Sequence, residues 1–196
     1  MIESFLIPMA AFALVTSITP GPNNLMLMAS GANFGFLRTI PHMLGVALGF
    51  TLMVFLMGVG LAQAFERWTR LHDILTIVSI SYMAFLSLKI ANAAAPDMAS
   101  KTGTPFTFLQ AAAFQWVNPK AWAMALTAVT LYAPGDGVWA MAAVAVVFGA
   151  VNLPSIGLWC RLGQELRRIL TNTTRLVWFN RTMAALLVLS LYPVLF

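Results

Sequence analysis

Residues 5–30 read FLIPMAAFALVTSITPGPNNLMLMAS, a stretch of 26 residues that contains no Lys, Arg, Asp or Glu. A helix that crosses the hydrocarbon core of a bilayer needs about 20 mostly apolar residues. The stretch therefore predicts a transmembrane helix, but the segment Thr19-Pro20-Gly21-Pro22-Asn23-Asn24 interrupts it with two prolines, a glycine and two amides. Both features, the long apolar run and the polar break inside it, recur later in the chain.

Five further segments are apolar over the length of a membrane span. A transmembrane β-barrel would instead show runs of about ten residues that alternate between apolar and polar. Because the runs here are long and continuous, we predict an all-α polytopic membrane protein with six transmembrane helices in one domain, residues 1–196. The predicted spans are residues 5–30, 39–64, 71–94, 106–132, 138–160 and 176–196.

The composition agrees with a chain whose surface lies mostly in lipid. Of its 196 residues 60% are hydrophobic and 9% are charged, and the mean hydropathy is +0.85, whereas a soluble domain carries about 25% charged residues. The net charge of +5 does not indicate a nucleic-acid partner, because the basic residues lie in short loops and form no continuous stripe. The single cysteine, Cys160, excludes an intramolecular disulfide and a four-cysteine zinc site, and we expect no metal and no cofactor.

The lysines and arginines predict the orientation in the membrane. Short cytoplasmic loops carry an excess of Lys and Arg. The loops after the first, third and fifth spans hold most of these residues, whereas the opposite side holds only Arg67 and Arg70. We therefore expect the first set to be cytoplasmic and both termini to be periplasmic. The cytoplasmic set is Arg38, Lys89, Lys101, Arg161, Arg167, Arg168 and Arg175, with Arg181 close by.

A second proline break lies in the predicted fourth span, at Gln115-Trp116-Val117-Asn118-Pro119-Lys120. Pro22 and Pro119 are 97 residues apart, almost half the chain. Three spans per half is an odd number, so we predict two inverted three-helix repeats, about residues 1–97 and 98–196, with helices 1 and 4 broken at their prolines. Broken helices at equivalent positions of inverted repeats mark the substrate sites of secondary transporters near the midplane. The alternative is that both prolines are ordinary kinks, which are common in transmembrane helices.

Each break should leave backbone groups in need of partners. A proline removes a backbone donor and clashes with the preceding turn. The carbonyls freed near Thr16 and Ile18 should therefore face protein or a wet cavity, because bare polar backbone is costly in lipid.

Lys120 is a charged residue near the middle of the span 106–132, about 20 Å from either end at 1.5 Å per residue. A lysine there costs at least about 2.5–3.5 kcal/mol on insertion scales, and its side chain is too short to reach the interface. It should face a cavity, pair with an anion or be neutral. We favour a role in solute binding over the structural alternative, in which the ammonium is tied to carbonyls freed by the breaks.

Amides surround both breaks, and Asn152 lies in the predicted fifth span, two residues before a proline. Amides can bind both ends of a zwitterion, the ammonium through oxygen and the carboxylate through nitrogen. The alternative is an interhelical hydrogen bond, typically worth about 0.6 kcal/mol, which we favour for Asn152 considered alone. The predicted solute-binding residues are Pro20, Gly21, Pro22, Asn23, Asn24, Gln115, Asn118, Pro119, Lys120 and Asn152.

The motifs Thr19-Pro20-Gly21-Pro22-Asn23 and Asn118-Pro119-Lys120-Ala121, in a chain with six predicted spans, resemble the LysE/RhtB family of amino-acid exporters, most of all its cysteine and O-acetylserine exporters. The resemblance covers the whole chain. It implies proton-driven efflux of small neutral amino acids or derivatives, of the cysteine, O-acetylserine, threonine or homoserine class, across the bacterial inner membrane. No Asp or Glu lies centrally in a predicted span, so the coupling group stays open among Lys120, His42, Asp73 and the solute itself.

Two other classes of function are weighed against export. An intramembrane enzyme would need a nucleophile with a base, or a set of metal ligands. His42, His72 and Cys160 lie at span edges and no H-E-x-x-H or G-x-S-x-G motif occurs, so we predict no enzyme. A passive pore usually shows rings of polar side chains, whereas the polar groups here are few and clustered.

The expected partners are a small amino-acid-like solute and the lipid bilayer. Gly45 and Gly49 form a G-x-x-x-G pattern in the predicted second span, which lets another helix approach closely. Internal packing is the favoured use of this pattern, and the seam of a homodimer is the alternative.

Overall fold

The computed structural model describes residues 2–67, 69–92, 104–133, 137–170 and 172–192. Over these residues every regular element is a helix and no strand occurs, so the all-α class is confirmed for them. Three helices are long and apolar enough to cross a membrane, over Phe36–Leu61, Asp73–Ala91 and Val138–Arg167. The elements are α1 (Ile2–Ile18), α2 (Pro22–Phe34), α3 (Phe36–Leu56), a π-helical stretch (Met57–Leu61), α4 (Ala62–Arg67), α5 (Thr69–Ala91), α6 (Phe108–Phe114), a 3₁₀ turn (Gln115–Val117), α7 (Pro119–Tyr132), α8 (Val138–Arg167) and α9 (Thr173–Leu189).

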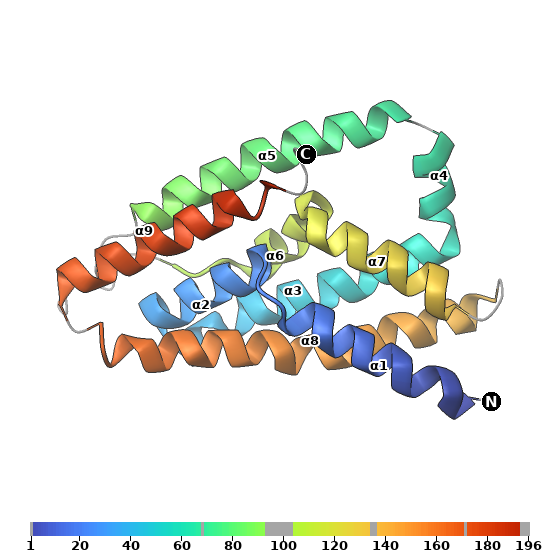
Figure 1. Ribbon diagram of the computed structural model, residues 1–196, viewed down its shortest axis with the longest axis horizontal. Coiled ribbons are helices and arrows are strands. Elements are labelled where there is room, and N and C mark those ends of the chain that lie inside the picture. Colours follow the sequence, from blue (N-terminus) through green and yellow to red (C-terminus); the bar gives the residue numbers. More distant parts are fainter. Residues whose placement is uncertain (1, 68, 93–103, 134–136, 171, 193–196) are drawn as a thin grey trace.

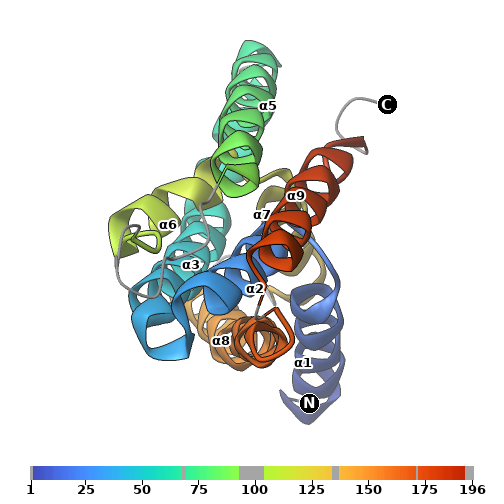
Figure 2. The ribbon, with the colours of Figure 1, turned by 90° about the vertical axis from the view of Figure 1, so that its left-hand side faces the viewer.

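Helix α8 is the long helix against which α1, α2 and α3 pack (Figure 1). Helices α5 and α9 lie side by side and form a second layer beyond α2 (Figure 2). The C-terminal ends of α5 and α8 and the start of α9 gather at one end of the bundle, at the left of Figure 1. Helix α1 begins near the opposite end, where α7 ends and α8 begins.

The predicted first span consists of two helices in the structure. Helix α1 ends at Ile18 and α2 begins at Pro22, the first residue of its first turn. Proline suits that position because its missing N–H has no partner there anyway and its fixed φ is already helical. Gly21, the residue before it, is extended, with φ −175° and ψ 177°.

The predicted fourth span is also divided. Helix α6 ends at Phe114, a 3₁₀ turn follows, and α7 begins at Pro119. The residue before a proline is disfavoured in the helical region, and Asn118 is accordingly extended, with φ −96° and ψ 106°. The side chain of Asn118 accepts a hydrogen bond from the backbone N–H of Lys120 at 3.2 Å, which caps the start of α7.

Two predicted boundaries differ from the structure. Helix α8 continues to Arg167, beyond the predicted end at Cys160, and Pro154 does not interrupt it. The predicted second span begins three residues earlier, as α3, and passes through the π-helical stretch, where Gly60 has φ 126°. The ends of the third and sixth predicted spans, residues 93–94 and 193–196, lie outside the described residues.

Glycines bring two pairs of helices into backbone contact. A Cβ atom on Gly31 of α2 would lie 2.1 Å from the carbonyl oxygen of Cys160 in α8, and one on Gly163 would lie 2.0 Å from the carbonyl oxygen of Met28. Helices α2 and α8 can approach this closely only because both positions lack a side chain.

The G-x-x-x-G pattern of α3 is likewise used inside the bundle. Cβ atoms on Gly45 and Gly49 would lie 2.3 Å from the carbonyl oxygen of Phe108 and 2.7 Å from the Cα atom of Ala112, both in α6. This face of α3 is therefore occupied by α6 and is not free for a partner subunit.

Candidate functional site

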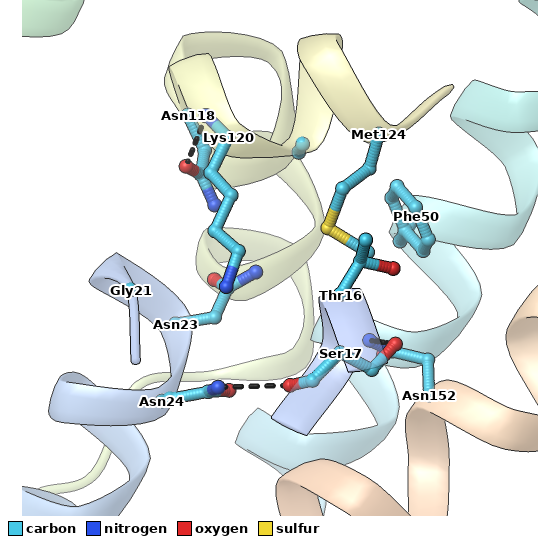
Figure 3. A pocket seen from close by; sticks show the side chains of 11 residues that line it. Thr16, Ser17, Gly21, Asn23, Asn24, Phe50, Asn118, Lys120, Met124 and Asn152 are labelled. Atoms are coloured by element: carbon cyan, nitrogen blue, oxygen red, sulfur yellow. Dashed lines mark hydrogen bonds between the residues drawn. The ribbon is translucent and has the colours of Figure 1, made fainter. Parts of the chain in front are cut away.

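A small cavity lies where α1 ends and α2 begins, enclosed by α7, α8 and α3 (Figure 3). Its volume is about 20 Å³, which has room for about one water molecule and not for an amino acid. Its wall combines amides, hydroxyls and one lysine with a few apolar groups. The lining residues are Thr16, Ser17, Gly21, Asn23, Asn24, Phe50, Asn118, Lys120, Ala121, Met124 and Asn152.

Side-chain donors from α2 and α8 bind the last carbonyl groups of α1. The amide nitrogen of Asn24 donates to the carbonyl oxygens of Ser17 and Thr19, both at 2.8 Å. From α8, the indole N–H of Trp159 donates to the carbonyl oxygen of Ile18 at 3.0 Å. These bonds replace the intrahelical partners that the break removes.

Lys120 crosses from the first turn of α7 to the same end of α1. Its Nζ donates to the carbonyl oxygens of Thr19 at 2.5 Å and of Pro20 at 3.3 Å. A cation is favourable at this place, because the C-terminus of a helix carries a partial negative charge. The contact seen in this structure is thus the one that the structural alternative for Lys120 predicts.

Gly21 makes room for the lysine. A Cβ atom at this position would lie 2.6 Å from Cδ and 3.1 Å from Nζ of Lys120. The side chain of Lys120 therefore lies directly over the backbone of the first break (Figure 3). Any side chain at position 21 would have to displace it.

A pair of amides joins the two breaks. The side chains of Asn23 and Gln115 exchange two hydrogen bonds, at 2.8 Å and 3.2 Å, across 92 residues of sequence. Gln115 also donates to the carbonyl oxygen of Ala111 at 2.8 Å. Because the amide pair and Lys120 both span the two broken helices, the breaks lie face to face.

Asn152 of α8 has one satisfied and one unsatisfied polar atom. Its Nδ2 donates to the hydroxyl oxygen of Ser17 at 3.2 Å. Its Oδ1 is buried and has no hydrogen-bond partner. A buried acceptor without a partner is rare in proteins and calls for an explanation, and here it borders the cavity.

The start of α2 adds a second polar feature. Its N-cap residue, Gly21, has no side chain, so no side chain caps the first turn. N–H groups that lack an intrahelical partner at such a turn, together with the helix dipole, favour an anion.

Six of the ten predicted solute-binding residues line the cavity: Gly21, Asn23, Asn24, Asn118, Lys120 and Asn152. The other four are adjacent without lining it. Pro22 and Pro119 begin helices, Pro20 offers its carbonyl to Lys120, and Gln115 holds Asn23.

Sequence reasoning did not include Ser17, Phe50, Met124 or Trp159 among the candidates. Ser17 could have been found, because it precedes the first break by one turn. Met124 could also have been found, because it follows Lys120 by four residues on α7. Phe50 and Trp159 lie on other helices, and no sequence signal connects them with the breaks. Over the described residues no group of three or more His, Cys, Asp or Glu side chains is placed to hold a metal ion.

Comparison with known proteins adds evidence independent of this geometry. Residues 14–190 match the family described as LysE type translocator. A cysteine/O-acetylserine efflux protein of Klebsiella pneumoniae is 25% identical over 191 residues, 96% of this chain and 93% of the relative. The corresponding protein of Salmonella choleraesuis is 30% identical over 122 residues, 62% of each chain.

The cysteine/O-acetylserine efflux protein of Escherichia coli O1:K1 is 29% identical over 122 residues, so the match spans 62% of that relative's length. No solved structure matches. The family match covers both breaks and the whole lining of the cavity. This chain therefore belongs to the LysE-type translocator family of membrane transport proteins.

Proposed function

We propose that the protein exports small neutral amino acids or close derivatives, of the cysteine, O-acetylserine, threonine or homoserine class, across the bacterial inner membrane. One observation carries the proposal. The two helix breaks meet at a cavity that offers a cation, an open helix N-terminus and an unpaired carbonyl oxygen. Those three groups complement the carboxylate and the ammonium of a zwitterion. The names of the relatives, cysteine/O-acetylserine efflux protein, favour the same solute class.

In this proposal the carboxylate binds between the first turn of α2 and Lys120, and the ammonium donates to Oδ1 of Asn152. Lys120 would then have two alternative partners. Without solute it binds the carbonyls of Thr19 and Pro20, and with solute it binds the carboxylate. The cavity of about 20 Å³ must widen before an amino acid enters, so solute binding and the release of Lys120 would be one event.

The proposed architecture has six spans in two inverted repeats, with α1–α2 and α6–α7 as the broken spans. Helices α1, α7 and α9 are shorter than a bilayer crossing, with 17, 14 and 17 residues. In this proposal each of the pairs α1–α2 and α6–α7 crosses the bilayer as two consecutive short helices joined at a break. The meeting of the two breaks supports this arrangement, because equivalent positions of inverted repeats lie near their common axis.

Both termini are proposed to be periplasmic. Arg38, Arg167 and Arg168 border one surface depression, and the ends of α5 and α8 gather at that end of the bundle (Figure 1). This clustering supports a cytoplasmic face there. Cysteines placed at Ser100 and Gly135, in a Cys160→Ser protein, should react with impermeant maleimide from opposite sides of the membrane. Reaction from the same side contradicts the topology.

The proposal is tested by export. Overproduction should raise tolerance to, and efflux of, at least one of L-cysteine, O-acetyl-L-serine, L-threonine and L-homoserine. Lys120→Met keeps much of the stem and removes the charge, so it should abolish export while the protein still inserts, and Lys120→Arg should retain part of it. Full export by Lys120→Met would make Lys120 structural and would overturn the site. Export of none of the four solutes would overturn the function.

Two alternatives have less support. A passive pore would need an open path, whereas the cavity at the breaks is nearly filled. An enzyme built on Cys160 would need an accessible thiol, whereas Cys160 is buried in an apolar cluster with Leu27, Val46 and Ile156. Saturation and counterflow in proteoliposomes separate a carrier from a pore, and Cys160→Ser should keep full export. A homodimer, if one forms, would have to use a surface other than Gly45 and Gly49.

A further inference from the structure

A second and much larger cavity lies further along α2. Its volume is about 390 Å³, against about 20 Å³ at the breaks, so of these two cavities only this one has room for an amino acid in the structure as it stands. It is bordered by α2, by His42 of α3, by the end of α5 and by Phe106 just before α6.

His42 is the unusual residue of this cavity. Its side chain is 1% exposed, and neither ring nitrogen has a hydrogen-bond partner. A neutral imidazole carries one donor and one acceptor, and buried polar atoms are nearly always paired. The imidazole ring packs against the ring of Phe106, with centroids 5.2 Å apart. This contact buries apolar ring surface but gives neither nitrogen a hydrogen bond. Both nitrogens are buried beside the cavity, so a polar ligand in the cavity would pair with one of them once the imidazole turns toward it.

Lys89 places a cation at the edge of the same cavity. The Nζ atom of Lys89, near the end of α5, lies 5.3 Å from the centroid of the Phe106 ring. Lys89 is exposed and belongs to the set that the sequence assigns to the cytoplasmic side. The aromatic ring of Phe106 thus contacts both the imidazole and the ammonium.

Helix α2 connects this cavity with the breaks. Its first turn, with Asn23 and Asn24, borders the small cavity. Ser30 and Asn33, further along the same helix, border the large one. At 1.5 Å per residue, Asn23 and Ser30 are about 10 Å apart along the helix, so the two cavities lie at successive positions along the same helix.

We propose that the large cavity is a cytoplasmic-side binding chamber, in which the amino acid is held before it enters the site at the breaks. Lys89 binds the carboxylate, and a ring nitrogen of His42 accepts a hydrogen bond from the ammonium. This inference rests on the proposed export of amino acids, and it adds a second binding site that export alone does not require.

The test uses protection of a cysteine against a maleimide. Asn92 borders the chamber and is exposed, so Asn92→Cys in the Cys160→Ser protein should react. O-acetyl-L-serine should slow the reaction, and it should still do so when Lys120→Met disables the site at the breaks. Lys89→Met should raise the concentration for half-protection about threefold to fivefold, as for an exposed charge pair. His42→Phe should raise it about fivefold, as for one lost hydrogen bond.

Arg175→Met is the matched control. Arg175, in the first turn of α9, is also exposed at this end of the bundle. Its guanidinium contacts the carbonyl oxygen of Ile169 at 3.4 Å, and neither residue borders the chamber. Arg175→Met should leave protection unchanged. If His42→Phe fails to insert, His42→Gln and Lys89→Met give the same test.

Two results overturn the chamber. A protein that exports O-acetyl-L-serine without any protection of Asn92→Cys refutes it and leaves the proposed function standing. Protection that is unchanged in both the Lys89 and the His42 variants refutes it as well. If no member of the four-solute panel is exported, the proposed function fails, and the chamber fails with it.

Discussion

Gly21→Ala should destabilise the protein through one side chain, that of Lys120. The backbone at position 21 is extended, with φ −175° and ψ 177°, and alanine adopts this conformation without strain. The new Cβ would lie 2.6 Å from Cδ of Lys120, so the lysine must leave the carbonyls of Thr19 and Pro20. A hydrogen bond from a charged donor contributes about 1.5–3 kcal/mol. Because the flexible stem can find other positions, we expect a net loss of about 1–2 kcal/mol.

Thermal unfolding of the purified protein in detergent measures this loss. For a chain of this length about 1 kcal/mol corresponds to roughly 2–4 °C in Tm, so Tm should fall by about 2–8 °C. Gly137→Ala is the matched control. Gly137 also precedes a helix in an extended conformation, with φ −79° and ψ 131°, and a Cβ there meets nothing within 4 Å. Its Tm should change by less than about 1 °C, since no contact is lost.

A double-mutant cycle isolates the contact between a methyl group at position 21 and the side chain of Lys120. Lys120→Ala removes the stem that the new methyl group strikes, so in that background Gly21→Ala should lower Tm by less than about 1 °C. An equal fall in both backgrounds would show that the cost of Gly21→Ala does not come from Lys120. Displacement of the lysine would then be refuted as the reason why position 21 requires glycine.

Two further substitutions test the packing around the site. Asn24→Ala removes two hydrogen bonds from the end of α1 and should cost about 1–3 kcal/mol, seen as a lower Tm; Asn92→Ala removes an exposed bond and should leave Tm nearly unchanged. Gly31→Ala places a methyl group 2.1 Å from a backbone oxygen of α8 and should prevent accumulation of folded protein in the membrane, judged by fluorescence-detected size exclusion. Gly157→Ala meets only the end of a methionine side chain, at 3.4 Å, and should elute like the parent protein. A normal profile for Gly31→Ala would contradict the α2–α8 contact.

The sequence predicted the elements around the breaks because proline and glycine act locally. Pro22 and Pro119 occupy the first position of their helices, a place that follows from the chemistry of proline alone. We expected the two breaks to meet because Pro22 and Pro119 are separated by almost half the chain, and the hydrogen bonds between Asn23 and Gln115 do join them. The partners of Lys120 were foreseen only as an alternative, since a sequence does not tell whether a buried cation meets backbone or solute.

The parts that the sequence did not predict depend on tertiary contacts. Helix α8 continues past Cys160 because polar side chains beyond that residue form stabilising ion pairs and hydrogen bonds. Glu165 pairs with Arg161 at 3.1 Å and with Arg168 at 3.0 Å, and Gln164 accepts the backbone N–H of Phe36 at 2.6 Å. Hydropathy measures the fit to lipid and cannot show where such a helix stops. The hydrogen bond from the indole N–H of Trp159 to the carbonyl oxygen of Ile18 joins residues 141 positions apart, so no local sequence pattern predicts it.

The glycine contact between α2 and α8 has a consequence for how the transporter moves. Helix α2 belongs to the first half of the chain and α8 to the second, yet their backbones touch at Gly31 and Gly163. Helices α3 and α6 are joined across the halves in the same way, at Gly45 and Gly49. A movement of one half of the chain against the other would have to slide or separate these backbone contacts. Helix α7 reaches the first break through the flexible stem of Lys120, so a spectroscopic label at the start of α7 should respond when a solute releases that stem.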